Sequence, residues 1–337
     1  MNIYNDTRFV VEKIPYQLPD NQYILVIIVK ATYDLLTNRE IITSFDQTPV
    51  FYADELYDSE KGGSTKFESD LVPTKLNTDV ILAGNAYAPN HQAVNALDVF
   101  MRVGRMEKNL RVIGDRYWIQ TALMGKLVPS EPVPFTEMPI IYENAFGGVN
   151  QQSGDICQSN PVGKGIIGKK AKAKTIVGLA LPNIENPYQL IDTHKEQPEP
   201  VGYGPIGKGW PPRLSLLGTY DEKWEKERSP LWPEDFSTAF FNAAPNDQQI
   251  PGFLKGDEPI YLKNLNANGD LSFNLPGHHP KVTVTKKTKN APANAIDMRL
   301  DTLTLLPNDN KFSQVWRGAC VINDLTAFDI KSIHVSV

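Results

Sequence analysis

Hydrophobic residues along this chain recur in short runs and in alternation, the two patterns that β-strands leave in a sequence. The longest apolar run covers residues 23–29 and consists of tyrosine, isoleucine, leucine and valine. Pro15 and Pro19 lie upstream, and together with the β-branched content they disfavour the competing interpretation as a buried helix. We therefore expect a central β-strand that is buried on both faces.

Alternating positions predict further strands in the first and last thirds of the chain. In residues 97–103 the hydrophobic side chains fall on one face, and a second strand is expected at residues 110–114, after Gly104. The segment Asn-Ala-Asn-Gly-Asp at residues 266–270 predicts a hairpin turn between two strands. Other short strands are expected at residues 80–84, 259–262, 271–275, 281–285, 300–306, 312–322 and 330–337.

Many short strands separated by turns, without long helices between them, indicate a mainly β fold. We expect an antiparallel sandwich or a distorted barrel, with long ordered Pro/Gly-rich loops and a few short helices. The 337 residues fit a single large β-rich domain, or two closely packed halves. Within it we distinguish N-terminal strands at 1–124, a loop-rich aromatic region at 125–258 and C-terminal strands at 259–337.

The region at residues 125–258 is rich in proline, glycine and asparagine and shows no long amphipathic period. Proline fixes φ and removes a hydrogen-bond donor, so long helices and interior strands are both disfavoured there. The best helix candidate covers residues 234–242, because Pro233 stands near its start and acidic residues occupy its first turn. Interspersed aromatic residues indicate that these loops are pinned to the core.

The charge balance makes polyanions poor partners for this chain. It carries 34 Lys and Arg against 39 Asp and Glu, a formal net charge of -5, and its pI is about 5.6. We therefore expect binding to neither nucleic acid nor membrane, and the run at residues 23–29 is far shorter than the about 20 residues of a membrane-spanning helix. The N-terminus shows no signal peptide, so we expect a cytoplasmic protein with two free cysteine thiols, a disulfide being the alternative.

Two glycine-rich segments match nucleotide-binding loops only in part. Residues 163–168 read Gly-Lys-Gly-Ile-Ile-Gly, but a dinucleotide fingerprint needs a strand before it and a helix after it. Residues 202–208 place two glycines and a lysine at P-loop spacing, yet Gly209 stands where Ser or Thr should bind magnesium. We expect no cofactor, and we interpret residues 163–168 as a turn in which glycine permits positive φ.

Catalytic and metal-binding patterns are equally weak. The sequence contains no Cys-x-x-Cys, His-x-x-x-His or Gly-x-Ser-x-Gly segment. Acidic pairs occur, but neighbours in sequence do not define the two different environments that general acid–base catalysis needs. We expect no catalytic or metal site; the alternative is a hydrolase-type enzyme that uses Asp115 and Glu143 in an acidic cleft.

Lysines gather in one part of the middle region, at Lys164, Lys169, Lys170, Lys172 and Lys174. Basic runs of this kind are usually solvated loops. In a chain that is acidic overall, they are also able to steer an acidic protein partner toward the surface. Both interpretations stay open from the sequence.

A series of short phrases, in order along nearly the whole chain, resembles the bacterial family called domain of unknown function 2169. The longest phrase is Met-Pro-Ile-Ile-Tyr-Glu-Asn-Ala-Phe-Gly-Gly at residues 138–148, and Asn-Pro-Val-Gly-Lys-Gly follows at residues 160–165. Each phrase is weak alone, whereas the ordered series is specific. The other phrases lie at residues 29–34, 53–55, 69–75, 78–80, 86–89, 103–104, 114–116, 181–185, 218–224 and 233–236.

The resemblance implies an adaptor or chaperone of type VI secretion. Its partners would be a toxin effector protein and the valine-glycine-repeat spike protein (VgrG) or the PAAR-tip protein. The family brings no catalytic residues, so we expect a binding module and not an enzyme. A secreted structural component of the spike is the remaining alternative.

Interface candidates come from the middle region, because aromatic and arginine side chains dominate binding energy at protein interfaces. For Phe146, burial in the core is the competing role. The six candidates are Tyr142, Phe146, Trp210, Arg213, Tyr220 and Trp224.

Overall fold

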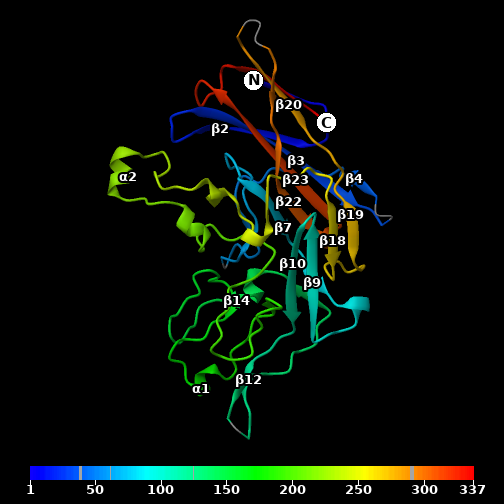
Figure 1. The fold of residues 1–337 in the computed structure, drawn as a ribbon, viewed down its shortest axis with the longest axis vertical. Coiled ribbons are helices and arrows are strands. Elements are labelled where there is room, and N and C mark those ends of the chain that lie inside the picture. Colours follow the sequence, from blue (N-terminus) through cyan, green and yellow to red (C-terminus); the bar gives the residue numbers. More distant parts are fainter. Residues whose placement is uncertain (38–39, 61, 124, 289–291) are drawn as a thin grey trace.

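The computed structural model describes residues 1–37, 40–60, 62–123, 125–288 and 292–337, and it is built mainly from β-strands (Figure 1). The strands form three larger sheets and several two-stranded ladders. In the described part of the chain none of these sheets closes on itself. The predicted mainly β class is therefore confirmed, in its sandwich form.

The largest sheet is organised around a long central strand. In order across the sheet its strands are β17 (Gln249–Pro251), β7 (Asn77–Leu82), β22 (Arg299–Leu306), β23 (Lys311–Ile322), β3 (Tyr23–Leu35) and β2 (Val10–Gln17), with β4 (Ile41–Thr43) also on β3. Strand β3 pairs along most of its length with β2 on one side and β23 on the other. Its residues 25–33 are all buried, which confirms the predicted central strand.

Two smaller sheets supply the second layer. One contains, in order, β16 (Ile184–Glu185), β10 (Met106–Ile113), β9 (Ala96–Val103), β18 (Pro259–Lys263) and β19 (Leu271–Asn274). The other contains β1 (Asn2–Asn5), β24 (Ile330–Ser336), β20 (Lys281–Lys286) and β21 (Asn294–Ile296). The predicted hairpin is confirmed, because β18 and β19 pair on either side of the turn at residues 266–270.

Side chains that alternate along the strands build the main core. Ile27 and Val29 of β3 belong to the same buried cluster as Met101 of β9 and Ile333 of β24. Full burial of a Leu or Ile side chain contributes about 1.5–3 kcal/mol, so this layer interface is the main apolar contribution to stability. The opposite face of β3 carries a smaller cluster around Val26.

Most strand pairs are antiparallel, as predicted, and three pairs in the described part of the chain are parallel. They are β7 with β22, β1 with β24, and β14 (Phe146–Gly147) with β15 (Lys164–Gly165). A parallel pair needs a long connection between its strands. The chain between β7 and β22 includes the whole middle region, and β1 and β24 lie at the two ends of the chain, close together in space (Figure 1). Alternation within each strand does not reveal these long-range pairings.

The middle region contains only short elements. Its two-stranded ladders and those nearby are β5 (Glu55–Leu56) with β6 (Thr65–Phe67), β8 (Asn85–Tyr87) with β13 (Glu137–Pro139), and β11 (Trp118–Gln120) with β12 (Leu127–Pro129). The α-helices are α1 (Ala173–Ile176) and α2 (Glu222–Glu227). Short 3₁₀ turns lie at Pro89–His91, Tyr142–Asn144, Arg213–Leu216, Thr238–Phe241, Asn246–Gln248 and Pro307–Asp309.

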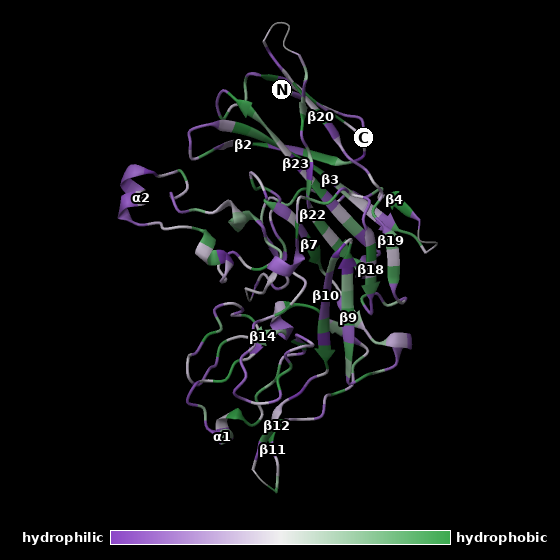
Figure 2. Cartoon of the chain, viewed as in Figure 1, coloured by the Kyte–Doolittle hydropathy of each residue, from purple (hydrophilic) through white to green (hydrophobic). Residues whose placement is uncertain are grey.

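Two parts of the chain stand away from the sandwich. Residues 115–123, 125–130 and 146–197 form a lower lobe, which has its own small core around Trp118 and Phe146 (Figure 1). Residues 219–236 form an arm that projects from the body and carries the hydrophilic helix α2 (Figure 2). None of the helices in the described part of the chain has the length or the apolar run needed to cross a lipid bilayer.

The helix predicted at residues 234–242 is wrong in extent. Only the 3₁₀ turn at Thr238–Phe241 forms there. The reason is that Asp235 points back and accepts hydrogen bonds from the backbone nitrogen and the hydroxyl of Thr219, at 2.9 and 2.8 Å. This carboxylate therefore closes the base of the arm and does not sit in a helical first turn.

Gln314 of β23 is an exception in the main core. It lies opposite Ala31 and Leu303, which are core residues, and its side chain is fully buried without a hydrogen-bond partner among the described residues. A buried polar group without a partner costs about 1–3 kcal/mol. We therefore expect Gln314→Met to raise the free energy of unfolding by about 1 kcal/mol in urea denaturation. Gln314→Glu should lower it, and a less stable Met variant would contradict this assignment.

Candidate functional site

A row of polar residues crosses the outer face of the largest sheet. In the strand register, Lys30 of β3 lies opposite Val315, Val315 opposite Thr302, and Thr302 opposite Asp79 of β7. Lys30 and Asp79 are both at most 1% exposed. Charges in such positions need partners, because an unpaired charge inside a protein is very costly.

Loops supply those partners. Lys30 Nζ lies 2.7 Å from the Asp70 carboxylate, and Lys75 Nζ lies 2.7 Å from the Asp79 carboxylate. Burial lowers the pKa of Lys30, and the carboxylate of Asp70 opposes that shift only in part. Burial has the same tendency at Lys75, but nearby carboxylates, Asp79 first, outweigh it and raise the pKa of that ammonium group. Lys75 is thus held in its charged form inside the protein.

The network continues into the middle region. Asp79 also accepts hydrogen bonds from the Asn242 amide and the Ala243 backbone nitrogen, at 2.9 and 2.8 Å. Glu68 pairs with Arg213, whose guanidinium also donates to the carbonyl oxygens of Phe240 and Ile206, at 2.8 and 2.9 Å. These bonds tie residues 206–243 to the outer face of the sheet.

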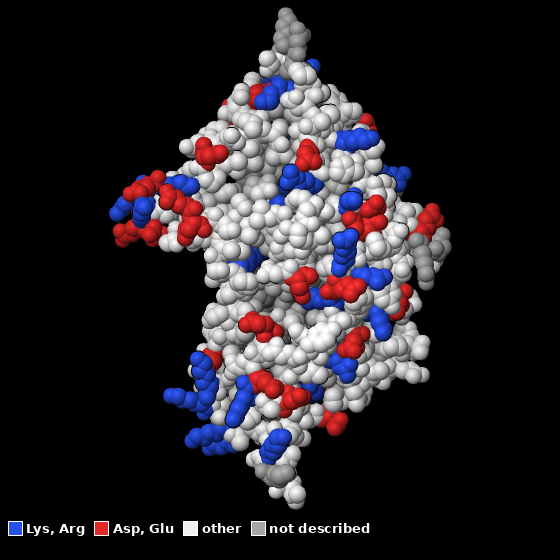
Figure 3. Space-filling view, viewed as in Figure 1, with Lys and Arg blue, Asp and Glu red and all other residues white. Residues whose placement is uncertain are grey.

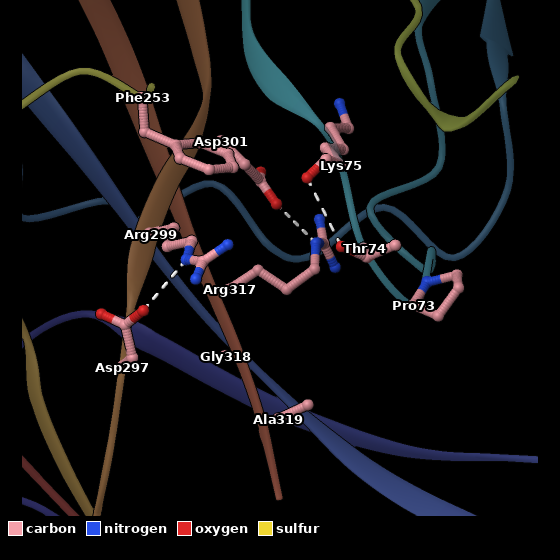
Figure 4. A pocket seen from close by; sticks show the side chains of 10 residues that line it. All are labelled: Pro73, Thr74, Lys75, Phe253, Asp297, Arg299, Asp301, Arg317, Gly318 and Ala319. Atoms are coloured by element: carbon pink, nitrogen blue, oxygen red, sulfur yellow. Dashed lines mark hydrogen bonds and ion pairs between the residues drawn. The ribbon is translucent and has the colours of Figure 1, made fainter. Parts of the chain in front are cut away.

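A pocket of about 240 Å³ opens beside this network (Figure 4). Arg317 Nε lies 2.6 Å from Asp301, and its guanidinium also donates to the carbonyl oxygens of Asp70 and Val72. At the rim, Arg299 pairs with Asp297 at 3.0 Å. The charged side chains that line the pocket are therefore engaged in ion pairs, and the arrangement is that of a structural clamp. Its lining residues are Pro73, Thr74, Lys75, Phe253, Asp297, Arg299, Asp301, Arg317, Gly318 and Ala319.

Two of the family-like phrases, residues 138–148 and 160–165, pack directly on each other. The Asn160 amide donates to the carbonyl oxygens of Tyr142 and Phe146, at 2.8 and 2.9 Å. Gly147 has φ +149°, and a Cβ there would lie 2.2 Å from the Asn160 carbonyl oxygen. Only glycine fits this close approach. The glycine pattern at residues 163–168 thus lies in a tight turn and a two-residue parallel ladder, and the next helix, α1, begins only at Ala173.

Asp115 and Glu143, the two acids of the enzyme alternative, accept hydrogen bonds from different parts of the chain. Asp115 accepts a hydrogen bond of 3.0 Å from the Asn183 amide, and Lys164 Nζ donates to the same Asn183 side chain at 2.7 Å. Glu143 accepts hydrogen bonds of 2.6 and 2.7 Å from the backbone nitrogen and hydroxyl of Ser64. Within the described ranges, no three His, Cys, Asp or Glu side chains gather in a group that could hold a metal ion.

The structure divides the six interface candidates into two groups. Tyr142, Phe146 and Arg213 are at most 5% exposed, so in this conformation they serve the interior. Burial also raises the pKa of Tyr142. Trp210 is half-buried and packs edge-on against Tyr142, with ring centroids 5.5 Å apart. Only the other two candidates belong to a projecting element.

Tyr220 and Trp224 meet on the arm, with ring centroids 4.6 Å apart. Tyr220 is 46% exposed. Trp224 is half-buried, and its indole nitrogen donates to the Leu231 carbonyl oxygen at 2.7 Å. A cleft of about 310 Å³ opens beside Trp224, between α2 and the returning segment of the arm at residues 233–235. The arm thus presents an aromatic pair next to a cleft, with charges of both signs around it (Figure 3).

Helix α2 was not predicted from the sequence, although its start carries a recognisable pattern. Asp221 caps the helix by accepting a hydrogen bond of 2.8 Å from the Trp224 backbone nitrogen. Glu222 and Glu225 occupy the first turn and Lys226 the last, which suits the helix dipole. A capping aspartate, then acidic residues in the first turn and a basic residue in the last turn, is the sequence pattern that would have predicted this helix.

Fold and site together define a class of protein: an open β-sandwich scaffold with internally paired buried charges and two projecting elements. The chain belongs to the family described as an uncharacterized protein conserved in bacteria (DUF2169), whose model matches residues 20–317. All of the phrases from which the sequence predicted this family lie inside the matched range. No curated protein and no solved structure matches the chain.

The ion pair between Arg317 and Asp301 generates a stability prediction. Both side chains are at most 4% exposed, so removal of one partner leaves a buried, unpaired charge. We expect Arg317→Met or Asp301→Leu alone to lower the free energy of unfolding by about 3–5 kcal/mol. The loss in the free energy of unfolding of the double variant should be clearly smaller than the sum of the losses of the two single variants, because the double variant buries no unpaired charge. Urea denaturation of all four proteins measures this coupling, and additive losses would contradict it.

Asn160 generates a second prediction, for the lower lobe. Asn160→Ala removes both amide bonds to buried carbonyl oxygens, so the midpoint of thermal unfolding should fall, at a cost of about 1–3 kcal/mol. Gln158→Ala, at an exposed neighbouring position, is the matched control and should leave the midpoint unchanged. Equal midpoints for Asn160→Ala and the native chain would show that the two phrases are not joined in this way.

Proposed function

We propose that this protein is a cytoplasmic, non-catalytic adaptor of type VI secretion. It binds a toxin effector and assists its loading onto the VgrG spike or the PAAR-tip protein. The resemblance described above supplies the secretion role. The structural observation that supports a binding role is the arm, which displays Tyr220 and Trp224 beside a cleft.

The polar groups of the molecule fit a scaffold better than a reaction centre. The buried charges of the large sheet face opposite charges, and Asp115 and Glu143 accept bonds from different neighbours. A general acid or base needs a group poised beside a substrate cleft. No specific feature of the described residues favours the hydrolase alternative over the binding role.

An exposed aromatic pair suits a protein partner. Tyr and Trp bury a large area at low entropic cost, and they are enriched where interfaces are energetically strongest. The charged residues around the pair would form the polar rim of such an interface, and Asp221 and Asp235 fix the shape of the arm from within. In this proposal Tyr142, Phe146, Trp210 and Arg213 shape the surface from behind and the effector contacts Tyr220 and Trp224.

Substitution on the arm tests the proposal. With the purified effector encoded beside this gene, Tyr220→Ala combined with Trp224→Ala should weaken binding about thirtyfold or more in isothermal titration calorimetry, the loss typical of a central aromatic contact. Tyr188→Ala, at a residue 86% exposed on the lower lobe, is the control and should bind normally. Near-ultraviolet circular dichroism verifies the fold of the body.

Secretion assays separate the adaptor from the alternatives. Deletion of the gene should abolish secretion of the effector while VgrG still reaches the culture supernatant. An effector that is equally soluble and equally secreted without this protein would refute the adaptor role. Detection of the chain itself in the supernatant alongside VgrG would instead support a structural component of the spike.

A further inference from the structure

The cleft beside Trp224 lies between the two halves of the arm, and its lining carries more negative than positive charge. Helix α2 and the residues just before it form one wall, and residues 233–235 form the other. Its volume of about 310 Å³ is in the range of ligand-binding clefts. The charged side chains that line it are the carboxylates of Asp221, Glu227, Glu234 and Asp235 and the cations of Lys223 and Arg228.

Internal hydrogen bonds hold the two walls of the cleft in place. The indole nitrogen of Trp224 donates to the Leu231 carbonyl oxygen at 2.7 Å, and Arg228 Nε donates to the Trp232 carbonyl oxygen at 2.6 Å. The Trp232 ring stacks on Phe236, with centroids 4.8 Å apart, in an apolar cluster of the body. The cleft is therefore formed before a partner arrives, and binding needs little ordering of the arm.

Two of the carboxylates in the cleft lack a counter-ion from the chain itself. Glu227 and Glu234 are exposed, and neither forms an ion pair with a residue that the structure describes. Asp235 is held in its charged form, because hydrogen bonds from Thr219 lower its pKa. The whole arm, residues 219–236, carries six acidic and three basic side chains, and Figure 3 shows acidic side chains along it. The lining thus has an excess of negative charge.

The aromatic pair of the arm offers a ring face to a cation. Trp224 lines the cleft, and the exposed Tyr220 meets it edge-on. Cations are attracted to the faces of aromatic rings, most strongly to tryptophan. The chain uses this contact elsewhere, where Lys30 Nζ lies 3.6 Å from the ring centroid of Phe51. On the arm, no lysine or arginine of the described ranges lies over either ring.

We infer that this cleft receives a basic side chain of the effector, and an arginine in particular. The guanidinium lies over the Trp224 ring and donates hydrogen bonds to Glu227 and Glu234. Arginine fits best, because its planar group stacks on aromatic rings while its edge donates to carboxylates. The inference rests on the proposed adaptor function and deepens it, since it names the part of the effector that the arm recognises as a basic segment.

Desolvation decides the sign of the charge that the partner brings. A partner that covers Trp224 also removes water from Glu227 and Glu234, because all three side chains line the same cleft. A carboxylate without a counter-ion is costly in such a place. An apolar segment would leave both glutamates unpaired, and an acidic segment would repel them. A basic segment is the partner that neutralises them.

Neutralisation of the two glutamates in the intact chain tests this inference. Glu227→Gln combined with Glu234→Gln keeps the size of both side chains and removes their charges. In isothermal titration calorimetry with the purified effector encoded beside this gene, we expect the affinity to fall about tenfold or more, because charge-assisted hydrogen bonds to the effector are lost. The difference from the native chain should shrink as the salt concentration rises.

Two further variants separate the cleft from the charge of the whole protein. Glu131→Gln combined with Glu199→Gln is the matched control, because it makes the same charge change at two exposed glutamates outside the arm. This control should bind the effector normally. Lys223→Gln removes a cation from the cleft and should strengthen binding, because a like charge no longer opposes the basic segment. Thermal unfolding and far-ultraviolet circular dichroism verify that each variant is folded.

Unchanged affinity of the Glu227→Gln/Glu234→Gln variant, with binding still lost in Tyr220→Ala/Trp224→Ala, would overturn the inference and leave the adaptor function standing. An equal loss in the control would assign the effect to net charge and overturn the inference as well. Stronger binding of the glutamine variant, or a loss of affinity that salt does not change, would have the same consequence. Failure of the native protein to bind the effector would overturn the adaptor function together with this inference.

Discussion

Burial of Lys30, Asp79 and Arg317 on the outer face of the largest sheet obliges the loops to bring opposite charges to them. Asp70 and Lys75, in the segment before β7, form ion pairs with Lys30 and Asp79. Asp301, near the start of β22, forms an ion pair with Arg317. Desolvated charges are tolerated only when such partners are in place. The irregular connections therefore lie where these ion pairs require, and the face would otherwise need an apolar cover.

The projecting elements depend on the same constraint. Asn242 and Ala243 bond to Asp79, and Arg213 bonds to Glu68, so the base of the arm is fixed to the ion-pair network while its tip extends outward. In the lower lobe, Asn160 and glycine-only close contacts join distant parts of the chain in a comparable way. Rigid attachment with free tips is the arrangement in which loops carry binding function.

Local patterns predicted the parts of the fold that local physics decides. Strand β3, the β9–β10 pair and the turn between β18 and β19 follow from apolar runs, alternation and turn chemistry. The pairing of Lys30 with Asp70 lies beyond such reasoning, because spacing along the chain does not encode register between distant segments. Aromatic candidates such as Tyr142 and Tyr220 look alike in sequence, and only packing makes one buried and the other exposed. A charged residue directly after an apolar run and inside the same buried strand, as at Lys30, is the local sign of a buried ion pair.

In a scaffold that binds through its surface, partner binding should slow hydrogen–deuterium exchange at the contact surface and leave exchange in the rest of the protein unchanged. Hydrogen–deuterium exchange of the chain, alone and with the purified effector, tests this central claim most directly. The proposed binding mode predicts new protection in the arm at residues 219–236, with exchange in β3, β22 and β23 unchanged. Protection confined to the residues around the pocket of Figure 4, or no new protection in a stable complex, would contradict it.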